Sequence, residues 1–143
     1  MFESCINKQQ EIKDIFNSIK TEESRYKKII DMGRELPALD IQLRVVENCV
    51  KGCQSLLYLH CDRKGNHLFF KAHSEALISK GLAALLIYVY QGEEAETILK
   101  CPPHFLEELK IISSLSFNRS NGLSNIYLRM KQDAIKSLVK NSL

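Results

Sequence analysis

The sequence predicts an α+β fold, in which a small antiparallel sheet of about three strands packs against several helices. Two runs of strand-forming composition, at residues 54–61 and 67–73, flank a pentapeptide that has hairpin-turn composition. Most of the remaining chain spaces its apolar residues as helices do. With 143 residues, of which 45% are hydrophobic, the chain can bury a real core, so we expect a single domain over residues 1–143.

The first third of the chain is predicted to form two helices followed by a loop. The apolar residues between positions 12 and 19 follow helical spacing, and Thr21 can begin a second helix that stops at Gly33. Pro37 cannot continue that helix, because proline lacks a backbone donor and disfavours helix at the residue before it. We therefore expect a loop that runs to about Asn48.

The two strands are expected to pair antiparallel, with their turn at residues 62–66. One face of the second strand gathers alternate apolar residues, namely Leu68, Phe70 and Ala72. This period of two is typical of a half-buried strand. A third strand is expected just before Cys49.

The second half of the chain is predicted to be helical. Ser74 is expected to cap a helix that ends at residues 91–92 and is apolar almost all round, so this helix should lie at the centre of the core. Shorter helices are expected at residues 93–100 and 105–112, and a last helix should begin near residues 120–121. In that last helix three basic residues are expected to face water: Arg129, Lys131 and Lys136.

Charge and hydropathy argue against nucleic-acid and membrane partners. The net charge is +3, and the basic residues are spread among 17 acidic ones rather than gathered into a patch. Residues 1–11 have no apolar core and so do not form a signal peptide. The most apolar stretch, residues 81–90, is about half as long as a bilayer-spanning helix. We expect a cytoplasmic protein.

The five cysteines are an odd number in a chain without a secretory signal, so we expect thiol chemistry or burial rather than a disulfide framework. Cys53 follows Gly52 directly before the first expected strand, which places its thiol on a loop, and Lys51 adds a positive charge nearby. Free cysteine is often a small buried hydrophobe, so position alone leaves a reactive role and a packing role open. Cys5 is expected to lie in a mobile tail.

Five short segments occur in a fixed order along the chain: residues 29–37, 48–55, 74–76, 80–82 and 119–123. In this order they resemble the SufE family, sulfur acceptors that serve cysteine desulfurases, and the resemblance spans residue 23 to about residue 134. The most specific element is Gly-Cys-Gln-Ser at residues 52–55.

The resemblance implies that Cys53 accepts sulfur as a persulfide from a SufS-like cysteine desulfurase and stimulates that enzyme. It also implies delivery of the sulfur to a SufBCD-like scaffold for iron–sulfur cluster assembly. Pyridoxal phosphate would belong to the desulfurase, so we expect this chain to hold no cofactor and to have no independent turnover. We further expect Cys53 to be partly shielded at rest and drawn outward when the desulfurase binds.

Several other residues have candidate supporting roles. Arg119 matches the family's arginine and is expected just ahead of the last helix, where it would stabilise a thiolate or persulfide; the alternative is an ordinary surface ion pair. Gln54 and Ser55 would hydrogen-bond either the persulfide or only the backbone. Asn48 is expected to brace the loop through its amide.

The remaining thiols have other candidate roles. Cys49 is expected to pack, with a resolving disulfide to Cys53 as the alternative. Cys101 and His104 resemble half of a metal site, but the other possible ligands are scattered, so no metal is expected. The rival functions are a thiol enzyme that pairs Cys53 with a histidine, and a zinc-binding or adaptor protein. Tyr58 stands where the family usually has tryptophan.

Overall fold

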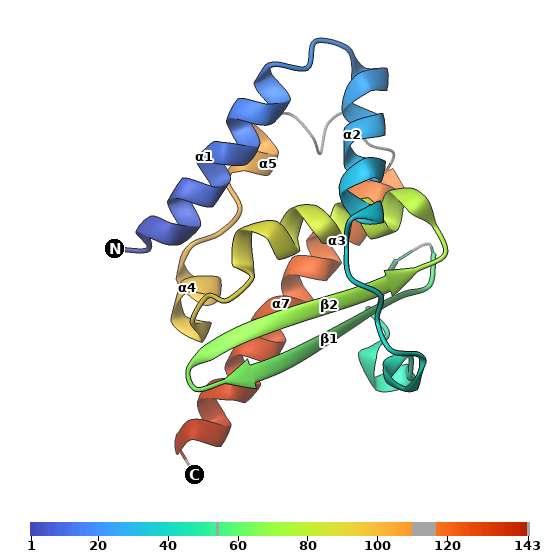
Figure 1. The fold of residues 1–143 in the computed structure, drawn as a ribbon. Coiled ribbons are helices and arrows are strands. Elements are labelled where there is room, and N and C mark those ends of the chain that lie inside the picture. The colour runs from blue at the N-terminus through green and yellow to red at the C-terminus, as the bar shows by residue number, and fades with distance from the viewer. Residues whose placement is uncertain (54, 110–116, 143) are drawn as a thin grey trace.

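The computed structural model describes residues 1–53, 55–109 and 117–142, and at residues 117–121 and 141–142 it describes only their place in a helix. The elements, in chain order, are α1 (Glu3–Asn17), α2 (Glu22–Arg34), η1 (Ile41–Leu43), η2 (Val46–Asn48), β1 (Leu57–Lys64), β2 (His67–Ser74), α3 (Leu77–Tyr90), α4 (Ala95–Lys100), α5 (Phe105–Glu108) and α7 (Phe117–Ser142). The fold is α+β, as expected, because these helices pack on a small antiparallel sheet (Figure 1).

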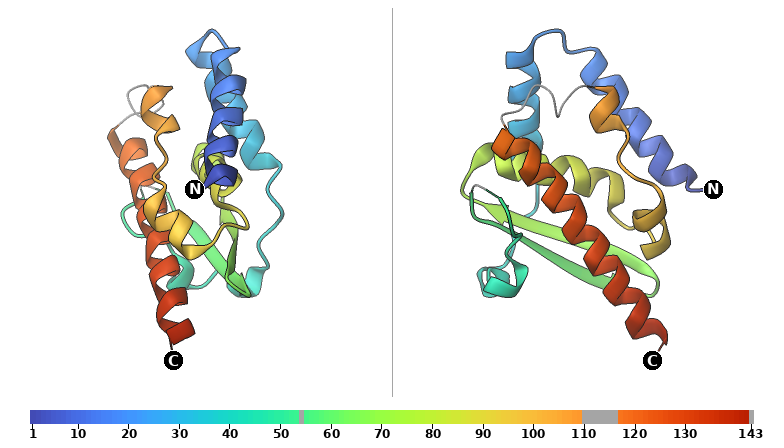
Figure 2. Two further views of the ribbon diagram at one scale, coloured as in Figure 1. Left: turned by 90° about the vertical axis from the view of Figure 1, so that its left-hand side faces the viewer. Right: turned by 180° about the vertical axis from the view of Figure 1, so that it is seen from behind.

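The α3 helix occupies the centre of the molecule. It contacts α1, α2, α7 and β2, and in Figure 2 it lies between the α1–α2 pair on one side and α4 with α7 on the other. Ten of its 14 residues are buried, which confirms the prediction from its apolar composition. Gly92, at φ 75°, lies just beyond its end, as expected.

The start of α3 differs from the prediction. Ser74 is the last residue of β2, and α3 begins only at Leu77. The hydroxyl of Ser74 donates to the carbonyl of Leu56 at 2.8 Å and accepts from the backbone N–H of Ala76 at 3.2 Å. Ser74 therefore joins the start of β1 to the approach to α3 instead of capping the helix.

The sheet has two strands in the described part of the chain, not three. β1 and β2 pair from Leu57 with Ser74 to Lys64 with His67, so the turn is shorter than expected. Ahead of β1, Cys49 forms only an isolated bridge with Tyr58. The third strand is absent there because the residues before Cys49 form the 3₁₀ turn η2, which uses their backbone donors within the turn. The apolar face predicted for β2 is confirmed as buried: Leu68, Phe70 and Ala72.

Close backbone packing joins α2 to α3. A Cβ atom on Gly33 would lie 2.6 Å from the backbone nitrogen of Gly81, and one on Gly81 would overlap the backbone of Ile29. Both glycines fall within segments that carry the family resemblance. Their lack of a side chain lets the two helices approach this closely.

The prediction that Cys5 lies in a mobile tail is wrong. α1 begins at Glu3, and its buried face is formed by Cys5, Gln9, Ile12 and Phe16. These positions follow helical spacing, but the polar Gln9 interrupts the apolar pattern and conceals its first turns. α1 packs on α3 and α5.

The last helix begins earlier than predicted, at Phe117. Its buried residues include Leu123, Ile126, Met130 and Ala134, while Tyr127 is half-buried and stacks on Tyr90 with the ring centroids 5.6 Å apart. The expected helix at residues 105–112 is seen only as α5, and residues 110–112 lie outside the described part. Where the structure describes the chain, no helix is both long and apolar enough to cross a membrane.

Candidate functional site around Cys53

Cys53 lies on the loop that joins η2 to β1, and the neighbouring Gly52 shapes this loop. Gly52 has φ 82°, a left-handed backbone conformation that side chains rarely adopt. A Cβ atom there would also overlap the side-chain amide of Asn125 in α7. That amide donates to the carbonyl of Gly52 at 3.3 Å. The loop thus turns sharply where it touches α7.

The thiol of Cys53 is half-buried against α7 and packs on the edge of the core. Its Sγ donates a weak, long hydrogen bond to the carbonyl of Gly122 at 3.9 Å. A Cβ atom on Gly122 would lie 3.8 Å from the sulfur, so a side chain there would narrow the space around it. The partial shielding that we expected for this thiol is present.

The surroundings of Cys53 favour the protonated thiol. Burial, and to a lesser degree the neighbouring Cys49, raise the pKa of Cys53 above its ordinary value. Lys51 is exposed, and its charge does not offset this effect. The resting thiol therefore has low nucleophilicity near neutral pH, because the thiolate is the reactive form.

Arg129 of α7 holds the start of the loop. Its guanidinium donates to the carbonyl of Glu47 at 2.7 Å and to that of Cys49 at 3.4 Å, and it pairs with Asp133 at 3.4 Å. The side chain is only 16% exposed, so the prediction that it faces water is wrong. The sequence does hold a signal for this role. Asn125, Arg129 and Asp133 recur at intervals of four, so these polar residues share one face of the helix.

Asn48, the last residue of η2, uses its amide to join η1 to β1 ahead of the loop. Its Nδ2 donates to the carbonyl of Leu43 at 2.7 Å and lies 3.3 Å from Nδ1 of His60. Ser55 is half-buried. Gln54 and the side chain of Arg119 lie outside the described residues, although Arg119 falls within the first turn of α7 rather than ahead of it.

A cavity of about 680 Å³ adjoins the loop between η2 and α7. Its lining includes Lys51, Lys136 and the exposed apolar residues Val46 and Leu128. Leu56, three residues after Cys53, is also exposed. Exposed apolar side chains with polar residues around them are typical of surfaces that bind another protein.

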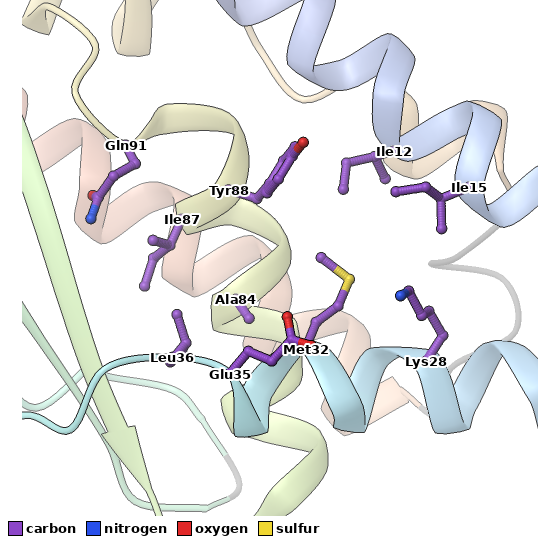
Figure 3. A pocket seen from close by; sticks show the side chains of 10 residues that line it. All are labelled: Ile12, Ile15, Lys28, Met32, Glu35, Leu36, Ala84, Ile87, Tyr88 and Gln91. Atoms are coloured by element: carbon purple, nitrogen blue, oxygen red, sulfur yellow. The ribbon is translucent and has the colours of Figure 1, made fainter.

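A second cavity, of about 370 Å³, lies between α1, α2 and α3 (Figure 3). Its walls are mostly apolar, from residues such as Ile12, Met32 and Ile87, with Lys28 and Glu35 among them. No residue of the Cys53 loop lines it. We therefore give it no part in the chemistry of Cys53.

The candidate metal ligands are not brought together in the described part of the chain, where no three histidine, cysteine, aspartate or glutamate residues are placed to hold an ion. Cys101 is buried whereas His104 is exposed, so the two do not form half of a site. Of the histidines, His60 bonds Asn48 and Asp62, His67 bonds the carbonyl of Gly92, and His73 bonds Glu75.

Comparison with known proteins places these features in a family. A family model described as an Fe-S metabolism associated domain, SufE, matches residues 10–134. The chain is 35% identical over 135 residues to SufE-like protein 1, chloroplastic/mitochondrial, of Arabidopsis thaliana, covering 93% of this chain and 36% of that protein. It is 29% identical over 115 residues to the sulfur acceptor protein CsdE of Escherichia coli, covering 79% and 78% of the two chains.

A solved structure shares the fold. The solution structure of a hypothetical protein from Thermus thermophilus superimposes with a TM-score of 0.76 at 25% identity, covering 92% of this chain and 96% of that one. The family model, the relatives and the shared fold agree, and the chain belongs to the SufE family.

Proposed function

We propose that this protein is a sulfur acceptor in which Cys53 carries the sulfur as a persulfide. The observation that carries the proposal is the place of Cys53 in a member of the SufE family: its thiol lies half-buried on a loop that Gly52 turns sharply. The relative CsdE is named a sulfur acceptor protein, which supports the same role here.

The proposed transfer is a thiol–persulfide exchange. The thiolate of Cys53 attacks the outer sulfur of a persulfide on the desulfurase, and the bond between the two donor sulfurs breaks. A new sulfur–sulfur bond forms on Cys53, and the donor cysteine leaves as a thiolate that takes up a proton. No electron acceptor is required, because one persulfide replaces another.

Activation of Cys53 requires the loop to move. The half-buried thiol has a raised pKa, so docking of the partner should expose it and allow it to ionise. The start of the loop is firmly held, because Arg129 binds two carbonyls there and Val50 donates to Leu57 at 2.9 Å. Cys53 itself has only the long contact with the carbonyl of Gly122, and Gly52 has the left-handed backbone of a sharp turn, so we place the hinge at Gly52.

Further residues would assist the transfer. Arg119 and the amino end of α7 would supply positive charge to a thiolate or persulfide, and Gln54 and Ser55 would hydrogen-bond it. Lys51 and Asn48 would take part in partner contact and loop support. These roles rest on the resemblance and on the place of each residue in the chain.

The proposed partners are a SufS-like cysteine desulfurase and a SufBCD-like scaffold that receives the sulfur for iron–sulfur cluster assembly. The desulfurase would hold pyridoxal phosphate, and this chain would have no turnover of its own. A cytoplasmic location remains a prediction, and one relative is chloroplastic or mitochondrial by name. The cavity beside the loop, with Lys51 and Lys136, would form part of the desulfurase contact.

The rival enzyme function finds no support in the described residues. A cysteine–histidine pair requires the imidazole within hydrogen-bond reach of the thiol. The described hydrogen bond of Cys53 goes to the carbonyl of Gly122, and the three sheet histidines have the other partners given above.

The direct test is to incubate the protein with a cysteine desulfurase and cysteine and to measure intact mass. The wild type should gain the mass of one sulfur atom, which dithiothreitol should remove, and Cys53→Ser should gain none. Cys61→Ser is the matched control, because Cys61 is also half-buried but lies within β1, and it should gain sulfur normally. Sulfur gain by Cys53→Ser would refute the proposal.

A further inference from the structure

A second pair of cysteines meets far from the Cys53 loop. Cys5 in α1 and Cys101, directly after α4, are both buried. The side-chain Nε2 of Gln9 lies 3.6 Å from Sγ of Cys5 and 3.7 Å from Sγ of Cys101. One amide nitrogen therefore contacts both sulfurs, and so two thiols that lie 96 residues apart in the sequence come close together.

Buried hydrogen bonds fix the positions of the two thiols. Gln9 is 7% exposed, and its amide also bonds the carbonyl of Pro102 and the backbone N–H of Phe105, each at 3.2 Å. The hydroxyl of Tyr90 donates to the carbonyl of Cys101 at 2.6 Å. The backbone around Cys101 is thus held from both α1 and α3.

We propose that Cys5 and Cys101 form a dithiol that a peroxide or a small disulfide such as oxidised glutathione converts to an intramolecular disulfide, linking α1 to the segment between α4 and α5. With hydrogen peroxide, one thiol is oxidised to a sulfenic acid with release of water, and the second thiol attacks that sulfur and releases a second water. With oxidised glutathione, two successive exchanges release two molecules of reduced glutathione.

The bond would form without leaving a buried polar group unpaired. Gln9 would lose its contacts with the two thiols but keep the carbonyl of Pro102 and the N–H of Phe105. A disulfide needs its two sulfur atoms about 2.05 Å apart, so both side chains must turn about χ1 to bring the sulfurs together from their shared contact with Gln9.

The reaction should be slow in the closed structure. Burial, followed by the interaction with Cys101, raises the pKa of Cys5 to about 12, so little thiolate is present near neutral pH. Reaction would require the first turn of α1 to open. No side chain caps that turn, because Phe2 precedes it with φ 62° and makes no capping hydrogen bond.

The disulfide would leave the proposed sulfur acceptor untouched. Cys101 is bonded to Tyr90 at the carboxyl end of α3, whereas Leu56, three residues after Cys53, is bonded to Ser74 just ahead of the amino end of α3. The two thiol sites thus lie toward opposite ends of this helix (Figure 1). The inference is therefore independent of the proposed function.

Peptide mapping of the whole chain tests the inference. After treatment with oxidised glutathione, free thiols are alkylated and the protein is digested with trypsin without reduction. The expected product links the peptide of residues 1–8 to that of residues 101–110, and dithiothreitol separates the two. The midpoint of thermal unfolding should rise by a few degrees on oxidation, because the bridge closes a long loop.

Variants make the result specific. Cys53→Ser should still give the linked peptide, and Cys5→Ser and Cys101→Ser should lose it. Cys61 serves as the control thiol for Cys5, because burial raises the pKa of Cys61 to about 12 as well. Neither the peptide of residues 1–8 nor that of residues 101–110 should become linked to Cys61. Recovery of Cys5 and Cys101 as alkylated thiols in the oxidised wild type, or their linkage mainly to other cysteines, would overturn the inference.

Discussion

Arg129 donates a hydrogen bond to the backbone carbonyl of Cys49 at 3.4 Å, and this bond connects the last helix to the start of the Cys53 loop. The same guanidinium binds the carbonyl of Glu47 and pairs with the carboxylate of Asp133. One side chain thereby anchors the loop upstream of Gly52, while the segment that carries the thiol has only weak described contacts with α7.

Replacing Arg129 should loosen the loop and destabilise the protein. Arg129→Ala removes the donors to both carbonyls and leaves Asp133 buried without its cation, so we expect a loss of about 1–3 kcal/mol in the free energy of unfolding. Urea denaturation measures this loss, and hydrogen exchange at residues 47–53 should become faster.

Lys131→Ala is the matched control for Arg129. Lys131 lies on the same helix and places its ammonium 4.7 Å from the centre of the Tyr127 ring, without contact to the loop. It should change the unfolding free energy by less than about 1 kcal/mol. Equal effects of the two substitutions on loop exchange would contradict the anchoring role of Arg129.

Gly52→Ala should displace the Cys53 loop. The substitution meets two obstacles, the left-handed φ of 82° and the overlap with Asn125. We expect a cost of about 1–2 kcal/mol from the backbone alone, and faster modification of Cys53 by a thiol reagent because the loop moves off α7. The alkylation rate of Cys53, followed by mass spectrometry, measures the second effect.

Gly65→Ala is the control that separates the effect of the positive φ from the effect of the overlap with Asn125. Gly65 also has a positive φ, 62°, but it lies in the hairpin turn, and a Cβ atom there would meet nothing within 4 Å. It should show a similar backbone cost without any change in the reactivity of Cys53. If both variants leave that reactivity unchanged, Gly52 does not control the position of the thiol.

The pH dependence of Cys53 alkylation reports its burial. Because burial raises the pKa of Cys53, the rate should reach half of its maximum at a pH above the value of about 8.5 seen for a free cysteine. The raised pKa also means that this thiol adds stability below its ordinary pKa, and that this contribution is lost as the pH rises through the folded value.

Binding of a desulfurase should reverse this shift. If docking draws the thiol outward, the midpoint of the alkylation profile should move to lower pH in the presence of a desulfurase whose own reactive cysteine is replaced by serine. An unchanged profile, in a complex confirmed by size-exclusion chromatography, would argue against opening of the loop.

Periodic patterns predicted the elements that are apolar on a regular face. The burial of β2 and the central place of α3 followed from their spacing alone, because a buried strand face or helix needs little besides apolar side chains. The start of α1 was missed because the buried Gln9 is polar, and its partners are a distant carbonyl and N–H that no local pattern reveals.

The site was predictable only in part. The resemblance selected Cys53 and Gly52, and the structure adds Gly122, Asn125 and Arg129, which reach the loop from a helix far along the chain. Such contacts depend on tertiary packing and cannot be read from local sequence. The sequence pattern places Arg129 on a polar helix face and so predicts that it faces water, whereas in the structure this side chain binds backbone carbonyls.

Gly81→Ala tests the close packing of α2 on α3 apart from the chemistry of Cys53. A methyl group at this position would overlap the backbone of Ile29, which cannot rotate away as a side chain can. We expect a loss of about 1–3 kcal/mol in unfolding free energy, measured by urea denaturation, as for other overpacked cores. Ala83→Gly in the same buried helix is the control, because it changes helix propensity without adding an atom. The lower helix propensity of glycine should reduce the unfolding free energy by about 1 kcal/mol, and the loss of the buried methyl group adds to this cost. A Gly81→Ala protein as stable as the wild type would show that the two helices do not pack backbone to backbone at this point.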